Sequence, residues 1–291
     1  MNYVYGLNPG EVFFTASDVG WVVGHSYIVY GPLIFGCSSI LYEGKPVNTP
    51  DAGSFWRIVQ DYKVSAIFSA PTAFRAIKKE DPEGEHLSRY DISSLQRIYM
   101  AGERLDPATY EWTTELTDLP VYDHWWQTES GWPMSANPVG IGAVKVKPGS
   151  STFPVPGYEI SVLDPLGKSL GSKEEGAICV RLPLPPGCLT TIWGDEERLQ
   201  GSYLNAFPGY YCSGHRLSTG EMEEILASHK DVAECAVVAQ PDELKGELPV
   251  GFVILKNSST IGHEQLQQEL IQSIRSEIGA IACLTHCSQV T

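Results

Sequence analysis

Residues 64–72 read VSAIFSAPT, residues 95–104 read LQRIYMAGER, and residues 121–131 read VYDHWWQTESG. Each stretch begins with an apolar run of strand length and ends in small or polar residues. Helical spacing of apolar residues precedes or follows these runs, over 55–59, 72–80 and, behind an Asp106–Pro107 N-cap, 107–116. Strands and helices that alternate with short connections predict right-handed crossovers and a parallel sheet, which is an α/β fold.

The chemically capable residues directly follow the three strands. Ala70–Thr72 follows the first, Gly102–Arg104 the second, and Trp126–Glu129 the third. In open α/β sheets the ligand crevice lies beyond the carboxyl ends of the strands, so these clusters predict one site. The alternative interpretation, that they are loop and helix-capping residues, is equally compatible with the spacing.

The pattern changes after residue 150. Residues 157–163 and 176–181 alternate apolar and polar side chains, which predicts an antiparallel meander or small barrel. A smaller α/β unit follows from about residue 215. Its predicted elements are a helix over 219–229, strands over 234–239 and 250–255, and a helix over 264–278.

Composition excludes several classes of protein. The 291 residues contain 20 Lys and Arg against 35 Asp and Glu, a net charge of −15, which disfavours nucleic acid and anionic membrane surfaces as partners. The most apolar stretch, residues 21–42, is interrupted by polar residues, glycine and proline, and predicts buried core rather than membrane insertion. No targeting peptide is visible, and seven scattered cysteines are typical of a reducing compartment.

Common catalytic motifs are missing from the sequence. It contains no Gly-x4-Gly-Lys-Ser/Thr phosphate loop, no Gly-x-Gly-x-x-Gly after a strand, and no Gly-x-Ser-x-Gly elbow. The sequence therefore does not support a Walker-type NTPase, a Rossmann dehydrogenase or a serine hydrolase.

Five segments carry a family resemblance. They are SDVGWVVGHSY at 17–27, APTAFR at 70–75, AGE at 101–103, DHWWQTESG at 123–131 and GHRLSTGEME at 214–223. In this order they resemble the adenylate-forming acyl-CoA synthetases, in their acetate/propionate branch. The resemblance implies a partial large adenylating domain over 1–211, with a parallel sheet, helices and an antiparallel β subdomain. A small α/β C-terminal domain would cover 212–291 and diverge after about residue 280.

The resemblance also implies a reaction and its reactants. ATP would convert a small carboxylic acid to an acyl-adenylate with release of pyrophosphate, and the thiol of coenzyme A would then displace AMP. The residues implied around the nucleotide are Gly102, Glu103, Arg104, Asp123, His124, Trp125, Trp126, Gln127 and Thr128. Among these, Thr128 would contact phosphate, while Glu129 would hold Mg2+ that offsets the triphosphate charge.

Further positions match residues of the family's small domain. Arg216 would reach phosphate and Arg275 would contact coenzyme A. His229, with the backbone of Ala227 and Val232, matches a minor cation site.

The implied acyl pocket consists of Val22, Val23, Ala101 and Trp126. The indole of Trp126 would limit the length of the acid. Acetate-preferring relatives carry valine at the position of Ala101, so the missing methyl groups leave room for one more carbon. Filling that room is worth about 1 kcal/mol, which predicts propionate over acetate.

The sequence departs from the family at three places. The family's phosphate loop lies upstream of the first segment, residues 209–214 run directly into His215–Arg216 without the ribose-binding aspartate and hinge, and no lysine follows Arg275. We therefore expect a truncated or spliced form with impaired catalysis. The alternative is a non-catalytic nucleotide- or CoA-binding fragment, one that could associate with a full-length homologue. The resemblance places such chains in the mitochondrial matrix or the cytoplasm.

Overall fold

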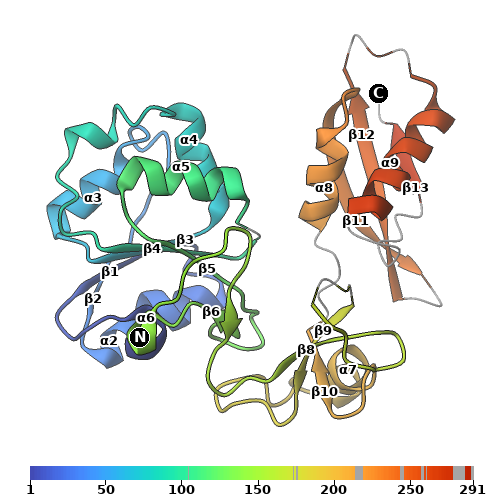
Figure 1. The fold of residues 1–291 in the computed structure, drawn as a ribbon, viewed down its shortest axis with the longest axis horizontal. Helices are drawn as coiled ribbons and strands as arrows, with labels where there is room; N and C mark the ends of the chain where they lie inside the picture. Colours follow the sequence, from blue (N-terminus) through green and yellow to red (C-terminus); the bar gives the residue numbers. More distant parts are fainter. Residues whose placement is uncertain are drawn as a thin grey trace. The chain divides into compact units, whose positions relative to one another are not determined.

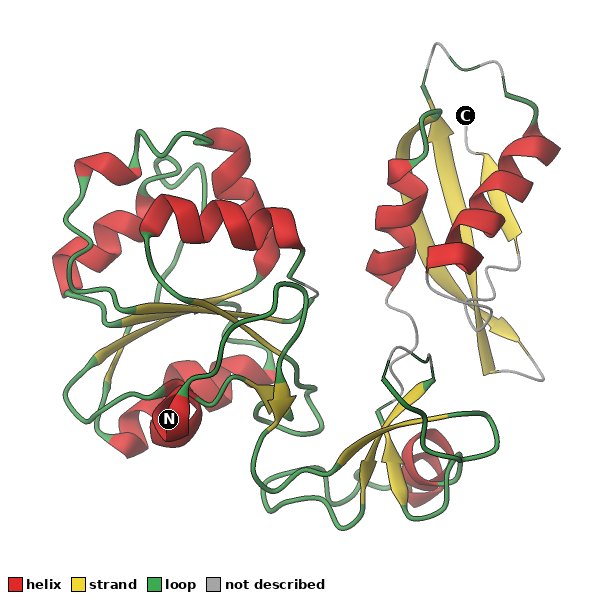
Figure 2. Ribbon diagram, viewed as in Figure 1, coloured by secondary structure: helices red, strands yellow, loops and turns green. Residues whose placement is uncertain are grey.

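A computed structural model describes residues 1–103, 105–172, 174, 176–213, 219–242, 246–256, 259, 261–277 and 286–289. The chain forms two compact units, one of residues 1–160 with 180–211 and one of residues 161–179 with 212–291. Figure 1 labels the elements and Figure 2 distinguishes helices from strands. Each unit is built around its own apolar core.

A five-stranded parallel sheet forms the centre of the first unit. Its order is β2-β1-β3-β4-β5, and every pairing in it is parallel. The strands are β1 (Val12–Ala16), β2 (Ser38–Ser39), β3 (Ala66–Ser69), β4 (Arg97–Ala101) and β5 (Val121–His124). The parallel sheet expected from the three quoted stretches is confirmed, and β1 and β2 extend it on the β3 side.

Helices cover both faces of this sheet (Figure 1). One face carries α3 (Ser54–Tyr62), α4 (Pro71–Glu80) and α5 (Pro107–Thr117), with the short 3-10 helix η2 (Leu87–Arg89) between α4 and β4. The other carries α1 (Asn2–Tyr5), the π-helix η1 (Gly24–Tyr30), α2 (Gly31–Phe35) and α6 (Val139–Gly142). The sheet is therefore buried on both sides, as its continuous apolar strands require.

Side-chain alternation divides the core of the first unit into two parts. Phe68, Tyr99 and Ala101 point to the side of η1, where they join Tyr5 and Tyr27 in what we call the η1-side core. Their strand neighbours Ile67, Ile98 and Met100 join Phe55 and Trp56 of α3 in the α3-side core. Successive residues of a strand face opposite sides, so each strand supplies both cores.

The predicted helices begin where their capping residues stand. The Asp106 carboxylate accepts a hydrogen bond of 2.8 Å from the Thr109 backbone N–H, and Pro107 occupies the first turn of α5. Pro71 similarly opens α4 after Ala70 in extended conformation. The helices expected over 55–59, 72–80 and 107–116 are confirmed, with ends that differ by at most three residues.

The expectation that residues 21–42 are buried core was wrong for much of the segment. Tyr27 and Ile28 are buried, whereas Trp21 is 65% and Ile34 84% exposed. The segment folds mainly as η1 and α2 along one face of the sheet. A helical segment on a sheet face buries only the side that touches the sheet, so a mostly apolar sequence still leaves many of its side chains exposed.

Residues 135–212 add short strands and, besides α6, two short helices. Strands β6 (Ser135–Ala136) and β7 (Phe153–Pro154) pair antiparallel. Strands β8 (Ile160–Leu163), β9 (Ala177–Arg181) and β10 (Tyr210–Cys212) form a sheet in the order β10-β9-β8. Helix α7 (Glu196–Leu199) continues into the π-helix η3 (Gln200–Leu204) before β10.

The second unit contains a small α/β layer after residue 218. Strand β12 (Gly246–Leu255) pairs antiparallel with β11 (Val232–Asp242) and parallel with β13 (His286–Gln289). Helices α8 (Thr219–Ser228) and α9 (His263–Glu277) lie beside this sheet (Figure 2). Leu226 and Leu270, one from each helix, are fully buried in its core. These two helices and the first two strands were predicted from sequence.

The described residues contain neither a membrane-spanning helix nor a disulfide. None of their helices is long and apolar enough to cross a membrane. The described cysteines, at positions 37, 179, 188, 212, 235 and 287, are free thiols.

Candidate active site

The turn after β4 is built around a glycine that allows close approach. Gly102 has φ +100°, and a Cβ placed on it would meet no atom within 4 Å. An L side chain is strained in this conformation. Glycine adopts it without strain and, having no side chain, leaves the backbone accessible. The expected nucleotide contact at Gly102 therefore falls on open backbone at the carboxyl end of a central strand.

Glu103, the next residue, contacts the beginning of α4. Its Oε1 accepts hydrogen bonds from the backbone N–H of Thr72, at 2.6 Å, and from the Thr72 hydroxyl. Its Oε2 lies 3.2 Å from the Arg75 guanidinium. A carboxylate at a helix N-terminus satisfies an otherwise unpaired N–H and the positive end of the helix dipole. The first two polar clusters predicted from the strand ends are thus joined through Glu103.

The third cluster follows β5, the neighbour of β4. Ala101 and His124 are register partners, which sets the last residues of β4 and β5 side by side. His124 is 2% exposed, and its ring lies 5.0 Å from those of Tyr5 and Tyr99. Burial lowers the pKa of His124 to about 3, so its imidazole is neutral at physiological pH and brings no positive charge to a phosphate.

Trp126 lies two residues beyond the end of β5 and is half-buried against the η1-side core. Its indole is 5.5 Å from the ring of Tyr27 and 6.4 Å from that of Phe68. Val23 and Ala101, two of the predicted pocket residues, belong to the same core, and Val22 is half-buried beside Val23. The structure therefore gathers three of the four predicted acyl-pocket residues, Val23, Ala101 and Trp126, in one apolar cluster.

The loop after Trp126 is held by its own hydrogen bonds. The Ser130 hydroxyl bonds to the backbone of Gln127 and to the Trp132 carbonyl, at 2.8 to 3.1 Å. The Ser26 hydroxyl of η1 donates a 2.6 Å hydrogen bond to the Gly131 carbonyl. These bonds leave Thr128 exposed at the surface of the loop. We call residues 127–132 the QTE loop.

Glu129 carries the single carboxylate of the QTE loop and is held by two hydrogen bonds. Its Oε1 accepts a 2.6 Å hydrogen bond from the Tyr203 hydroxyl, and its backbone carbonyl accepts one of 2.6 Å from Leu189 N–H. The Tyr203 ring stacks on Tyr211, which donates a 2.9 Å hydrogen bond to Gln127 Oε1. Burial and the bond to Glu129 raise the pKa of Tyr203 to about 12, which keeps it a hydrogen-bond donor. Both tyrosines were missed from sequence, since they lie over 70 residues from the loop.

The residues present fit a magnesium ion that is shared with a phosphate. The described residues contain no group of three His, Cys, Asp or Glu side chains that could form an all-protein cage. Mg2+ is usually bound through one or two carboxylates together with substrate phosphates and water. In the described structure Glu129 Oε2 has no hydrogen-bond partner, so it is the oxygen that could take this role.

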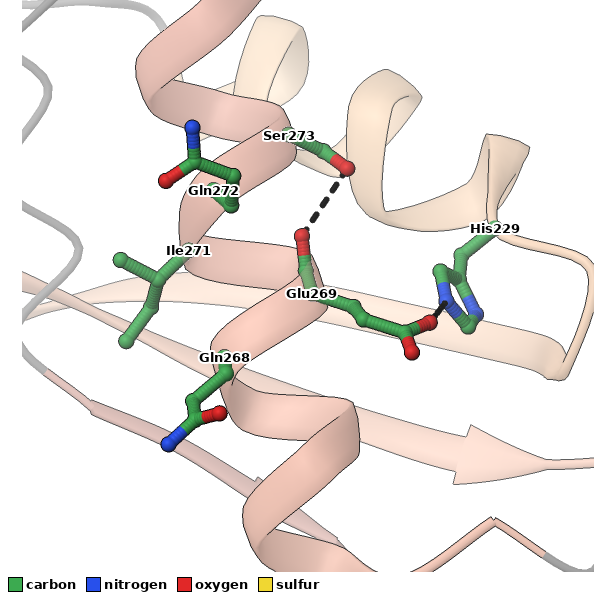
Figure 3. A pocket seen from close by; sticks show the side chains of 6 residues that line it. All are labelled: His229, Gln268, Glu269, Ile271, Gln272 and Ser273. Carbon is green, nitrogen blue, oxygen red and sulfur yellow. Dashed lines mark hydrogen bonds and ion pairs between the residues drawn. The ribbon is translucent and has the colours of Figure 1, made fainter.

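The predicted minor cation site lies in the second unit. His229 follows α8, and its Nε2 is 3.0 Å from Glu269 Oε2 of α9 (Figure 3). Hydrogen bonds from His229 and then Gln265 lower the pKa of Glu269. Ala227 is exposed near the end of α8, and Val232, at the start of β11, donates its N–H to the His229 carbonyl at 3.0 Å. The imidazole of His229 is therefore paired with Glu269, a residue that the sequence did not indicate.

Three predicted residues remain without a described side chain. Arg104 and Arg216 lie outside the described residues, and Arg275 belongs to α9 but its side chain is not described. The roles predicted for these arginines stay predictions.

Sequence comparison identifies the class of protein to which this fold and site correspond. The sequence pattern of the AMP-binding enzyme family matches residues 1–186, and that of the AMP-binding enzyme C-terminal domain matches residues 221–291. The chain belongs to the AMP-binding enzyme family, which confirms the resemblance seen in the motifs.

Individual relatives agree with this assignment. An uncharacterized protein of Pseudomonas aeruginosa is 51% identical over 96% of this chain and 49% of its own length. The human acyl-CoA synthetase short-chain family member 3, mitochondrial, is 42% identical over 97% of this chain and 45% of the relative. The propionate–CoA ligase of Escherichia coli K12 is also 42% identical, over 96% and 49%.

A solved structure shows the same fold. The crystal structure of Brucella canis acyl-CoA synthetase superposes with a TM-score of 0.63 and 28% identity, over all of this chain and 55% of that one. The chain spans about half the length of the curated relatives it matches.

Proposed function

We propose that the first unit binds the adenylate of a short carboxylic acid, with propionate preferred over acetate, as part of an AMP-forming acid–CoA ligase. ATP, coenzyme A and the acid are the reactants of this proposal. Support comes from family membership and from relatives named acyl-CoA synthetase and propionate–CoA ligase. Those relatives include a mitochondrial and a bacterial protein, so a mitochondrial or cytoplasmic location stays a prediction.

The observation that carries the preference for propionate is the position of Ala101. Its side chain is 5% exposed, ends β4, and lies in the η1-side core against which the Trp126 indole packs. Valine there would add two methyl groups to the space between strand and indole. Each methylene of ligand buried in that space is worth about 0.8 kcal/mol, which is roughly a fourfold difference in affinity.

The chain's own residues divide the work of binding in this proposal. Uncovered backbone at Gly102 meets the nucleotide, and the exposed Thr128 hydroxyl meets phosphate. Bound Mg2+ would offset the charge of the triphosphate, with Glu129 as its protein ligand. The neutral His124 supports the loop from the core and does not transfer a proton near neutral pH.

The test uses stable alkyl esters of AMP as probes. Calorimetry on the wild-type chain should give the propyl ester an affinity about fourfold above that of the ethyl ester. Ala101→Val should remove this preference while the affinity for free AMP stays unchanged. Ala136→Val makes the same change elsewhere in the η1-side core and should keep the preference. Equal affinity of the wild type for both esters would refute the choice of propionate.

Turnover by this polypeptide alone should be slow. By the resemblance, the segment with the ribose-binding aspartate has no counterpart, because residues 209–214 run directly into His215. Loss of one preorganised polar group typically lowers the rate by ~100–1,000-fold. Formation of propionyl-CoA at rates of about 10 per second, typical of enzymes, would contradict this part of the proposal.

A further inference from the structure

We propose that Tyr203 is a positioning residue for the cation-binding carboxylate of Glu129, and that its stacking on Tyr211 sets its place. The inference rests on the proposed function, because it assigns the role of Glu129 in binding Mg2+ with ATP. No sequence motif of the chain indicates Tyr203 or Tyr211, which contact the motif residues Glu129 and Gln127. All of them belong to the first unit.

Two contacts hold Glu129 from the side of residues 189–211, one at its carboxylate and one at its backbone. The Tyr203 hydroxyl donates to Oε1 at 2.6 Å, and the Leu189 N–H holds the backbone carbonyl of the same glutamate. With Oε1 engaged, the carboxyl group cannot rotate freely. Oε2 is then the oxygen presented to a cation, and Tyr203 determines its direction.

The tyrosine itself is held by an aromatic partner. The rings of Tyr203 and Tyr211 lie 5.5 Å apart with planes at 6°, and Tyr211 donates to Gln127 Oε1. Tyr203 comes from η3 and Tyr211 from β10, so one stacked pair contacts two residues of the QTE loop. A glutamate side chain has three rotatable bonds. Because the contact with Tyr203 already restricts them, Glu129 loses less conformational entropy when it binds a metal.

The experiment compares ATP binding at increasing Mg2+ with AMP binding in EDTA, both by equilibrium dialysis. Tyr203→Phe keeps the stacked ring and removes the hydroxyl, so the Mg2+ concentration that half-saturates ATP binding should rise about tenfold. AMP binds without the metal, and its affinity should stay within about twofold. A purely structural role would weaken both ligands together.

Two tyrosine variants serve as controls. Tyr211→Phe loses the bond to Gln127 but keeps the stack on Tyr203, so the Mg2+ requirement should shift less than in Tyr203→Phe. Tyr210→Phe changes the neighbouring strand position, which faces the opposite side of β10, and should alter neither ligand. In a Glu129→Gln background, Tyr203→Phe should add no further loss, since the two residues act through one contact.

Each result either supports or overturns the positioning role of Tyr203. An unchanged Mg2+ requirement in Tyr203→Phe, or an equal loss of AMP affinity, overturns the positioning role and leaves the proposed function standing. A wild-type chain that binds neither AMP nor ATP refutes the proposed function and the inference together. A tenfold shift confined to Mg2+ and ATP supports the role of Tyr203.

Discussion

The buried imidazole of His124 makes the stability of the first unit depend on pH. Its pKa falls from 6.5 to about 3 on folding because burial penalises the charged form. The stabilising effect of the neutral imidazole is therefore complete above pH 6.5 and is lost as the pH falls toward 3. For these two pKa values, linkage gives a loss of about 2 kcal/mol in unfolding free energy between pH 7 and pH 5.

Substitution of His124 by phenylalanine should remove this loss. The described structure gives neither ring nitrogen a hydrogen-bond partner, and the neighbours Tyr5, Phe68 and Tyr99 are aromatic, so a phenyl ring suits the site. Urea unfolding at pH 5, 6 and 7 measures the effect through tryptophan fluorescence. All seven tryptophans lie in the first unit, so the signal reports on that unit alone.

The unfolding free energies of wild type and His124→Phe are compared at each pH, because the other titrating groups affect both proteins equally. Wild type should lose about 2 kcal/mol more than His124→Phe between pH 7 and pH 5. The exposed His25 provides a matched control, and His25→Gln should follow the wild type. An identical pH dependence in wild type and His124→Phe would refute the reasoning, since it would mean that His124 is not buried as a neutral group.

Two further substitutions test how the elements are held. Asp106→Ala should cost about 1 kcal/mol in urea unfolding, because it removes the N-cap of α5 and the 3.2 Å ion pair with Arg75; an unchanged midpoint would show that the cap contributes nothing. Leu270→Ala should cost about 2–5 kcal/mol in the second unit, where the side chain is fully buried. Circular dichroism of the thermal transition measures it, and a loss below about 0.5 kcal/mol would contradict the assigned core.

The local elements of this protein could be read from its sequence. Helices α3, α4, α5, α8 and α9 follow the apolar spacing of their residues, and Asp106 marks the start of α5 through a contact only three residues long. The QTE loop likewise carries its family signature in consecutive residues. These features depend on neighbours in the chain, which is why periodicity and motifs suffice to find them.

Exposure was harder to predict where a segment is mostly apolar. Residues 21–42 contain too few polar side chains to show which face of η1 and α2 meets the sheet, and Ile34 proves to be largely exposed. His124 shows the opposite case. It is a titratable residue that looks exposed in the sequence, but its position in β5 points its side chain into the aromatic core. Burial is set by what packs on an element, and that information lies in other parts of the chain.

The sequence alone determined the α/β class, the parallel strand–helix order and the residues of the QTE loop, because each rests on spacing within short segments. Only the tertiary structure decided which distant side chains hold that loop and the histidine of the second unit. Tyr203 reaches Glu129 across 74 residues, and Glu269 reaches His229 across 40. Such pairs form when separate elements pack together, and no local pattern encodes the distance between them.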